Sequence, residues 1–300
     1  MKINKIEHFD ISRKIVSSIT SESWETVPHV CLTYEPEVTG FIQVLNEINK
    51  GSSKLDRITI NTAVLKVIVE GLKACPKMNG HIRFNRGLLR GQVEIMKNID
   101  ISMPVMFDWG MMTINMHNME NKSMRQMRDS IADSLRRAAN SDMNEVMFDV
   151  SKNDTIKGLK QGKIKQTINR IVGLKLGKYK VRTLSIRERK QYYDIPECDR
   201  LTRHDVEQGT VTVSNMGSIY KGWRGECTLL EIIPPQLVAI AVGAVQEKPV
   251  ITENGIIRTG KVLPFTIAFD HRALDTSDIV PFMKKLDQIF YEPKMIKKYV

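Results

Sequence analysis

The chain has 300 residues, of which 42% are hydrophobic, so it can bury one large core or two of ordinary size. Its 45 Lys and Arg residues exceed its 34 Asp and Glu residues, and the formal net charge is +11 at pH 7. No apolar run reaches the roughly 18 residues that a membrane-spanning helix needs, so we expect no transmembrane segment. The first residues are not followed by the apolar stretch of a secretory signal.

The cysteines and histidines indicate no metal or disulfide framework. The four cysteines are widely separated, at Cys31, Cys75, Cys198 and Cys227, and no Cys-x-x-Cys pair occurs. This pattern is typical of reduced thiols in a cytoplasmic protein and favours neither a disulfide set nor a zinc site. The six histidines are also dispersed, so we expect no metal centre. The sequence contains no glycine-rich phosphate-binding loop and no internal repeat.

The first half of the chain alternates helix and strand patterns. Apolar residues at helical spacing predict helices over 9–20, 44–49, 61–74 and 123–139, the first capped by Asp10 or Ser12. Alternating or continuous apolar runs predict strands over 29–35, 81–84, 92–95, 101–107 and 111–116. The apolar stripe of the 61–74 helix is most simply explained as core.

The last hundred residues continue the alternation. Residues 211–217 predict a strand that ends in a polar turn, and 234–243 predict a turn that leads into a buried strand. A further buried strand over 266–270 is followed by an amphipathic helix pattern, with apolar residues at Ile279, Phe282, Met283, Leu286, Ile289 and Phe290. Because strands and helices alternate throughout, the predicted fold class is α/β.

The end of the 266–270 strand is the strongest candidate for chemistry. The strand runs directly into Asp270-His271-Arg272, and Asp275 stands four residues after the histidine. An imidazole takes and returns a proton near neutral pH, so a histidine held at a strand end suits general base catalysis. The alternative is structural, since Asp275 or Thr276 can cap the helix that follows. Spacing alone does not decide between the two roles.

Five segments, taken in their order along the chain, carry a resemblance to a known family. They are 12–16 (Ser-Arg-Lys-Ile-Val), 27–30 (Val-Pro-His-Val), 211–217 (Val-Thr-Val-Ser-Asn-Met-Gly), the Pro-Pro-Gln strand at 234–243 and the segment around His271. Together they resemble the acyltransferase (E2) catalytic domain of the 2-oxoacid dehydrogenase complexes, which is related to chloramphenicol acetyltransferase. The resemblance covers about 1–140 and 200–300. It implies a single catalytic domain over 1–300, with a mixed β-sheet and helices packed on one face.

The resemblance also implies an activity and a set of site residues. The reaction would be coenzyme A-dependent acyl transfer between acyl-CoA and a thiol of the dihydrolipoyl type, an amine or a hydroxyl. His271 would be the general base and Ser214 would donate a hydrogen bond to the oxyanion of the tetrahedral intermediate. Asp275 would pair with Arg13 and hold the catalytic loop in shape. Without the resemblance, Ser214 is best explained as a turn residue and Arg13 as a solvated surface residue.

The same resemblance implies partners. The family builds its active site between the subunits of a trimer, so we expect a homotrimer or a multiple of one, with His271 and Ser214 supplied by neighbouring chains. The catalytic match begins within the first fifteen residues. We therefore expect no lipoyl attachment site in this chain, and a lipoyl domain would have to act in trans. No metal and no covalent acyl-enzyme are implied.

One position departs from the family motif His-x-x-x-Asp-Gly. Thr276 stands where the family has glycine, and a β-branched residue resists the positive φ that glycine adopts easily. Either the local turn differs or the active site is altered. The alternative function is therefore a catalytically impaired trimeric core or scaffold protein of the same fold.

A basic insert is predicted at about 141–200. Residues 151–200 hold 14 Lys and Arg against 5 Asp and Glu, a net charge of +9 out of the +11 of the chain. The insert is either a solvated lid or oligomer arm, or a docking surface for something acidic. Because the charge is concentrated here and no nucleic-acid-binding motif accompanies it, we expect no binding to nucleic acid.

Overall fold

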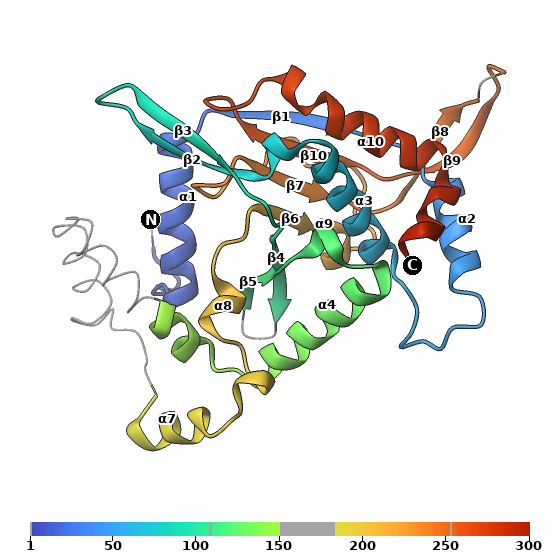
Figure 1. Ribbon diagram of the computed structural model, residues 1–300. Coiled ribbons are helices and arrows are strands. Elements are labelled where there is room, and N and C mark those ends of the chain that lie inside the picture. The colour runs from blue at the N-terminus through green and yellow to red at the C-terminus, as the bar shows by residue number, and fades with distance from the viewer. Residues whose placement is uncertain (1, 108–109, 151–183, 253) are drawn as a thin grey trace.

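The computed structural model describes residues 2–107, 110–150, 184–252 and 254–300 (Figure 1). A six-stranded sheet forms its centre, with the strand order β1-β10-β7-β6-β4-β5. The strands are β1 (His29–Tyr34), β4 (Ile101–Phe107), β5 (Gly110–Met116), β6 (Val211–Asn215), β7 (Val238–Val242) and β10 (Phe265–Asp270). Strands β4, β6 and β7 run parallel, and the other neighbours pair antiparallel. The predicted mixed sheet is confirmed.

Large side chains fill the face of the sheet that carries the core. Val213, Ile240 and Ile267 lie side by side on β6, β7 and β10, and they belong to the main hydrophobic cluster. Helices α3 (Ile60–Ala74) and α10 (Val280–Tyr291) add Ile68, Leu72, Phe282 and Leu286 to the same cluster. The apolar stripe predicted as core over 61–74 is therefore part of the core. Truncating one buried side chain of this size typically lowers the free energy of unfolding by about 2–5 kcal/mol.

The neighbouring rows of side chains, on the opposite face, are small. Ser214, Ala241, Thr266 and Thr33 form one row across four strands, and Thr212, Ala239, Ala268 and Cys31 form another. Ala239 and Ala268 pack with Val27, Leu230 and Ile232 in a second, smaller cluster. The residues around Val27 and Leu230–Ile232 therefore pack on this face of the sheet, whereas helices α3 and α10 pack on the other face.

Two hairpins extend from the body of the molecule (Figure 1). Strands β2 (Gly80–Asn85) and β3 (Arg90–Ile95) form the first, and β8 (Gln246–Ile251) and β9 (Ile257–Val262) form the second. The strands predicted over 81–84 and 92–95 are confirmed by the first hairpin. The strands of the second hairpin were not predicted.

The remaining helices complete the chain. They are α1 (Ile11–Thr26), α2 (Thr39–Ile48), α4 (Met124–Ala139), α7 (Ile186–Tyr193), α8 (Arg203–Val206) and α9 (Met216–Ile219), with a further helix at 143–150. The side chain of Asp10 accepts a hydrogen bond from the Arg13 N–H, so the first of the two predicted caps of α1 is confirmed. All four cysteines are free thiols, and only Cys75 is buried.

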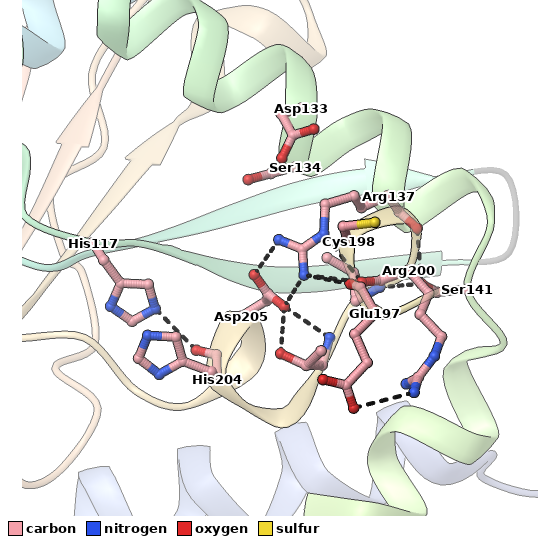
Figure 2. A network of polar contacts seen from close by, with 12 residues as sticks. His117, Asp133, Ser134, Arg137, Ser141, Glu197, Cys198, Arg200, His204 and Asp205 are labelled. Atoms are coloured by element: carbon pink, nitrogen blue, oxygen red, sulfur yellow. Dashed lines mark hydrogen bonds and ion pairs between the residues drawn. The ribbon is translucent and has the colours of Figure 1, made fainter. Parts of the chain in front are cut away.

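Hydrogen bonds join the described ends of the predicted insert to the core and to each other (Figure 2), while most side chains of α7 are exposed. The Arg137 guanidinium, at the end of α4, donates to both carboxylate oxygens of Asp205 on α8, at 2.7 and 2.6 Å. It also donates to the Arg200 carbonyl. The Tyr193 hydroxyl joins the two flanks, since it donates to Asp149 at 3.0 Å and to the buried Glu145 at 3.2 Å. Residues 151–183 lie outside the described part of the chain.

A histidine pair ties α8 to the ends of β4 and β5 (Figure 2). His117 Nδ1 lies 3.3 Å from a carboxylate oxygen of Asp100, and its Nε2 lies 3.0 Å from the His204 carbonyl. The His204 ring stacks on the His117 ring, and the two ring centroids are 3.8 Å apart. Because both ring nitrogens face acceptors, the doubly protonated imidazolium fits this position best. The Asp100 hydrogen bond accordingly raises the pKa of His117, despite its burial.

We expect the protein to lose stability as the pH rises from about 6.5 through the raised pKa of His117. A histidine with a raised folded-state pKa stabilises the fold below its unfolded pKa, near 6.5, and loses this contribution above its folded pKa. Asp100 acts in the opposite direction. Burial opposes its ionisation, but hydrogen bonds from His117 and Asn118 lower its pKa, so its contribution is lost only at acidic pH. Urea unfolding at several pH values should give a smaller decline between pH 6 and 8 in His117→Gln. Parallel curves would contradict the assignment.

Candidate active site

His271 lies at the end of β10, as predicted. Its backbone N–H donates to the Pro28 carbonyl at 3.0 Å, which fixes it beside the residue before β1. The Ala273 and Leu274 N–H groups both donate to the Asp270 carbonyl, so the chain turns tightly around the histidine. The ring meets Phe269 edge to face, with centroids 6.2 Å apart, and its side chain is 53% exposed. The backbone of His271 is therefore held in place by hydrogen bonds, and its ring is accessible to a substrate.

The hydrogen bond of the ring selects one tautomer. His271 Nδ1 lies 3.1 Å from the Leu274 carbonyl oxygen. A carbonyl only accepts, so in the neutral imidazole Nδ1 carries the proton and Nε2 carries the free lone pair. That is the state a general base requires. The sequence predicted the base, but it did not predict the carbonyl that orients it.

Asp275 lies beside His271 and not beside Arg13. Its Oδ1 is 3.4 Å from His271 Nδ1, and its side chain is 72% exposed. Arg13 is exposed in the first turn of α1, whereas the last turn of α1 lies near His271, about 20 Å further along the helix. Among the described residues, Arg13 and Asp275 form no ion pair, so the predicted pairing is wrong for a single chain. The prediction that Asp275 pairs with Arg13 depended on where α1 packs in the fold, and the spacing of the sequence motifs does not show this.

Asp275→Asn is expected to change the free energy of unfolding by about 0.5 kcal/mol or less, as most exposed substitutions do. The carboxylate is largely solvated, and among the described residues its one ion-pair contact is with the half-exposed His271 imidazole. Urea denaturation of the purified variant checks this. A loss of more than about 2 kcal/mol would mean that Asp275 is buried against a partner that one chain does not contain.

Thr276 is accommodated without strain. It begins the 3₁₀ helix Thr276–Ile279, and the N–H of Asp275 donates to the Asp278 carboxylate at 3.0 Å in front of it. Among the described residues other than glycine, only Leu89 and Asn118 have positive φ. The turn therefore does not need the backbone freedom of glycine at this position. Of the two alternatives that the sequence left, a local turn compatible with threonine is the one observed.

Ser214 lies far from His271 within one chain. Ser214 and Thr266 both stand opposite Ala241, so Ser214 is level with a residue five positions before His271 on β10. The separation along the strand is about 17 Å, because each residue advances about 3.4 Å, and β7 lies between the two strands. Ser214 is half-buried, and among the described residues its hydroxyl has no hydrogen-bond partner. The two candidate residues are at opposite ends of the sheet.

The ion pair between Asp270 and Arg272 beside His271 was not predicted from the sequence. Asp270 is completely buried, and the Arg272 guanidinium donates to both of its carboxylate oxygens, at 3.0 and 2.6 Å. The available signal was the pair of opposite charges on either side of the histidine. Their approach depends on the turn that follows β10, in which the Arg272 N–H donates to the Asp270 carboxylate, so strand alternation does not predict it.

Two hollows of the described part of the chain are lined by neither candidate residue. An open groove of about 920 Å³ lies between the end of β1 and α10, and the Tyr34 hydroxyl donates to Asp287 at 2.6 Å beside it. A small cavity next to the Ser214 row is lined by Met216, Ala241 and Thr266. Neither is lined by His271 or Ser214. Because Ser214 and His271 are about 17 Å apart along the sheet, the described part of one chain does not bring the base and the hydroxyl together.

In the parts of the chain that the structure describes, none of the helices combines the length and apolar character that crossing a bilayer requires. Within the same residues, no group of three or more His, Cys, Asp or Glu side chains is arranged to hold a metal ion.

Comparison with solved structures places the fold. The dihydrolipoamide acetyltransferase of Azotobacter vinelandii superposes with a TM-score of 0.65 at 16% identity, covering 99% of this chain and 94% of the other. A probable dihydrolipoamide acetyltransferase from Listeria monocytogenes gives 0.64 at 17% identity, covering 96% and 95%. The fold that the sequence resemblance implied is thereby confirmed.

Curated relatives match along nearly the whole chain. The pyruvate dehydrogenase acetyltransferase component of Mycoplasma genitalium is 25% identical over 279 residues, which is 91% of this chain and 54% of the relative. That of Rickettsia bellii is 22% identical over 289 residues, which is 96% and 53%. The chain thus spans about half the length of the curated relatives it matches.

The family model of the 2-oxoacid dehydrogenases acyltransferase catalytic domain matches residues 2–152 and 182–297. The match includes His271, Ser214, Asp275 and Arg13, and it also includes the flanks of the insert predicted at 141–200. Only the middle of that segment lies outside the match. With most of its length matched and the fold shared, the chain belongs to the 2-oxoacid dehydrogenases acyltransferase (catalytic domain) family.

Proposed function

We propose that the chain is a coenzyme A-dependent acyltransferase with His271 as its general base. The observation that carries the proposal is the bond from His271 Nδ1 to the Leu274 carbonyl, in a member of this family. It leaves Nε2 unprotonated on an exposed ring at a rigid strand end. The acyl acceptor is a thiol of the dihydrolipoyl type, and an amine or a hydroxyl would react by the same steps. The relatives' name, dihydrolipoyllysine-residue acetyltransferase, supports the thiol.

The proposed reaction proceeds through one tetrahedral intermediate. Nε2 of His271 takes the proton of the acceptor thiol. At the same time, the sulfur of this thiol attacks the thioester carbonyl of acyl-CoA. The carbonyl oxygen becomes an oxyanion, and the Ser214 hydroxyl donates a hydrogen bond to it. The intermediate then collapses, the carbon–sulfur bond to coenzyme A breaks, and the imidazolium returns its proton to the leaving thiolate. Asp275 keeps a solvated negative charge near the imidazolium, and Arg13 has no role in this scheme.

The site is proposed to form between chains of a homotrimer. Ser214 and the His271 of the same chain are at opposite ends of the sheet, so they cannot act on one substrate carbonyl. A neighbouring chain that presents its His271 to this Ser214 would complete the site. Several large apolar side chains of the two hairpins are exposed in one chain, including Phe84, Leu89 and Ile257, and they offer surface for such contacts. A stable monomer near 34.3 kDa in light scattering would contradict this arrangement.

Incubation with acyl-CoAs tests the function directly. The protein is mixed with acetyl-CoA, or with a longer acyl-CoA, and with free dihydrolipoamide, and free coenzyme A is separated by chromatography and quantified. Total thiol is unchanged by the exchange, so a thiol dye would miss it. Protein-dependent and saturable release of coenzyme A, with S-acyl-dihydrolipoamide as the matching product, is the expected result. Release no faster than in buffer with every acyl-CoA would contradict the proposal.

A trimer without turnover would favour the alternative of a scaffold protein. Thr276 was the sequence feature in its favour, and the ordinary backbone at this position removes the conformational argument for it. The free Nε2 of His271 and the unbonded Ser214 hydroxyl instead retain what catalysis needs. The acyltransferase is therefore the function that the geometry favours.

We further propose that the chain is one catalytic domain whose insert is shorter than the sequence pattern indicated. Residues 153–181 fall outside the family match and carry 8 Lys and Arg against one Asp. The flanks on either side are matched and anchored through Tyr193 and Arg137. The net charge of +7 in 153–181 suits an acidic partner, such as a lipoyl domain acting in trans.

Replacing 153–181 with a short Gly/Ser link is expected to leave the melting temperature within a few degrees of the parent. The Tyr193 hydroxyl donates to Asp149, so the described residues on the two sides of the excised segment are in contact without it. A twofold change in loop length costs only about 0.6 kcal/mol. The same variant should bind acidic partners less tightly at low salt, and the difference should shrink at higher salt. An unfolded product would place 153–181 in the core.

A further inference from the structure

The Asp-His-Arg segment contains a charged pair that the proposed mechanism does not use. The Asp270 side chain is fully buried, and the Arg272 side chain is 21% exposed. Four contacts join them: Arg272 Nε lies 3.0 and 3.1 Å from the two carboxylate oxygens, its terminal nitrogen lies 2.6 Å from one of them, and its backbone N–H donates at 3.0 Å to the other. A buried carboxylate is expensive unless it is paired in this way.

The pair closes a ring of hydrogen bonds around His271. Asp270 holds the backbone N–H of residue 272 with its carboxylate, and it holds those of residues 273 and 274 with its carbonyl. Its own N–H donates to the carbonyl of Leu237, the residue before β7. The backbone of His271 is thus fixed from both sides by a single residue. Rotation of the turn would move the Leu274 carbonyl, which is the hydrogen-bond acceptor of Nδ1, and would also move Asp275, whose carboxylate lies 3.4 Å from the same nitrogen.

We propose that Asp270 and Arg272 are positioning residues that set the tautomer and direction of the His271 ring. This inference rests on the proposed function of His271 and deepens it. The Arg272 guanidinium also lies over the Phe84 ring of β2, at 5.9 Å from its centroid. The first hairpin therefore helps to hold Arg272 in place beside Asp270. The pair touches no reacting atom, and its effect on the reaction passes through the imidazole.

The first readout is kinetic. With Asp270→Asn, the amide keeps the shape and an acceptor oxygen but loses the charge that holds the guanidinium. We expect kcat to fall by about 10–10²-fold, as small displacements of catalytic groups do, while KM for acyl-CoA changes by less than about threefold. Arg272→Lys retains a cation without the bidentate fork and should fall between the parent and Asp270→Asn. It also provides a folded variant if Asp270→Asn is unstable.

The matched control is the Arg137–Asp205 pair. It is also a bidentate arginine–aspartate pair, with side chains 16% and 10% exposed, and it lies in the α4–α8 network away from His271. Asp205→Asn should lower the melting temperature but leave kcat of the folded protein within about twofold of the parent. If both variants lose stability and neither loses kcat, Asp270 is only a structural residue and the inference is wrong.

The second readout does not need activity. ¹⁵N NMR of labelled imidazoles distinguishes a ring protonated on Nδ1 from one protonated on Nε2. The parent should show a single Nδ1–H tautomer for His271, and Asp270→Asn should show a mixture, while Asp205→Asn keeps the parent spectrum. An unchanged His271 spectrum in folded Asp270→Asn would overturn the inference. If the parent shows the tautomer but transfers no acyl group to any acceptor, the proposed function fails while the positioning role of Asp270 is still decided.

Discussion

His271→Ala is expected to lower acyl transfer by about 10²–10⁴-fold, the usual cost of losing a general base. The side chain makes one hydrogen bond, to the Leu274 carbonyl, and about half of it is exposed. Its removal therefore deletes little packing, and the variant should stay folded. The rate of coenzyme A release from acyl-CoA in the presence of dihydrolipoamide is the measurement, with circular dichroism as the folding check.

His204→Ala is the matched control for this experiment. His204 is also exposed, and its ring stacks on His117 outside the proposed site. It should retain the parent rate within about threefold. A His271→Ala protein that turns over within a few-fold of the parent would show that His271 is not the base. A loss that is equal in both variants would point to a general effect on folding instead.

Much of the fold could be predicted because local pattern and packing agree. The helix at Ile60–Ala74 has its apolar residues at helical spacing, and these same residues are buried. The strand at Phe265–Asp270 is mostly apolar and is buried along its whole length. Strands β8 and β9 were not predicted, because Arg258, Gly260 and Lys261 break the alternation of β9 and the two strands depend on pairing with each other.

The candidate site could be predicted only as separate residues. The position of His271 follows from a strand that ends at a polar turn, which is local information. The opposite placement of Ser214 depends on the parallel and antiparallel order of β6, β7 and β10, which no local pattern contains. The Arg13–Asp275 pairing is absent within the described residues of one chain for a related reason, since it depends on how α1 docks. The extent of the insert stays a prediction, and our proposal of a shorter one rests on the family match to its flanks.

Mixing two inactive variants should restore activity, and this is the sharpest test of a site shared between chains. Ser214→Ala alone is expected to lose about 10²–10³-fold and His271→Ala alone about 10²–10⁴-fold. In a trimer assembled at random from equal amounts, a site is intact when a chain with His271 faces a neighbour with Ser214. About one site in four meets this condition, so about a quarter of the parent activity should return.

A second mixture separates the two possible geometries. Wild-type chains are assembled with the double variant Ser214→Ala/His271→Ala, again in equal amounts. Shared sites then leave about a quarter of the parent activity, whereas sites within single chains would leave about half. Co-expression with two affinity tags ensures that mixed oligomers are measured. If tagged hetero-oligomers form and the single variants restore nothing, the two residues do not act across an interface. The separation of about 17 Å along the sheet would then exclude Ser214 from the reaction of its own chain, and the oxyanion donor would have to be another group.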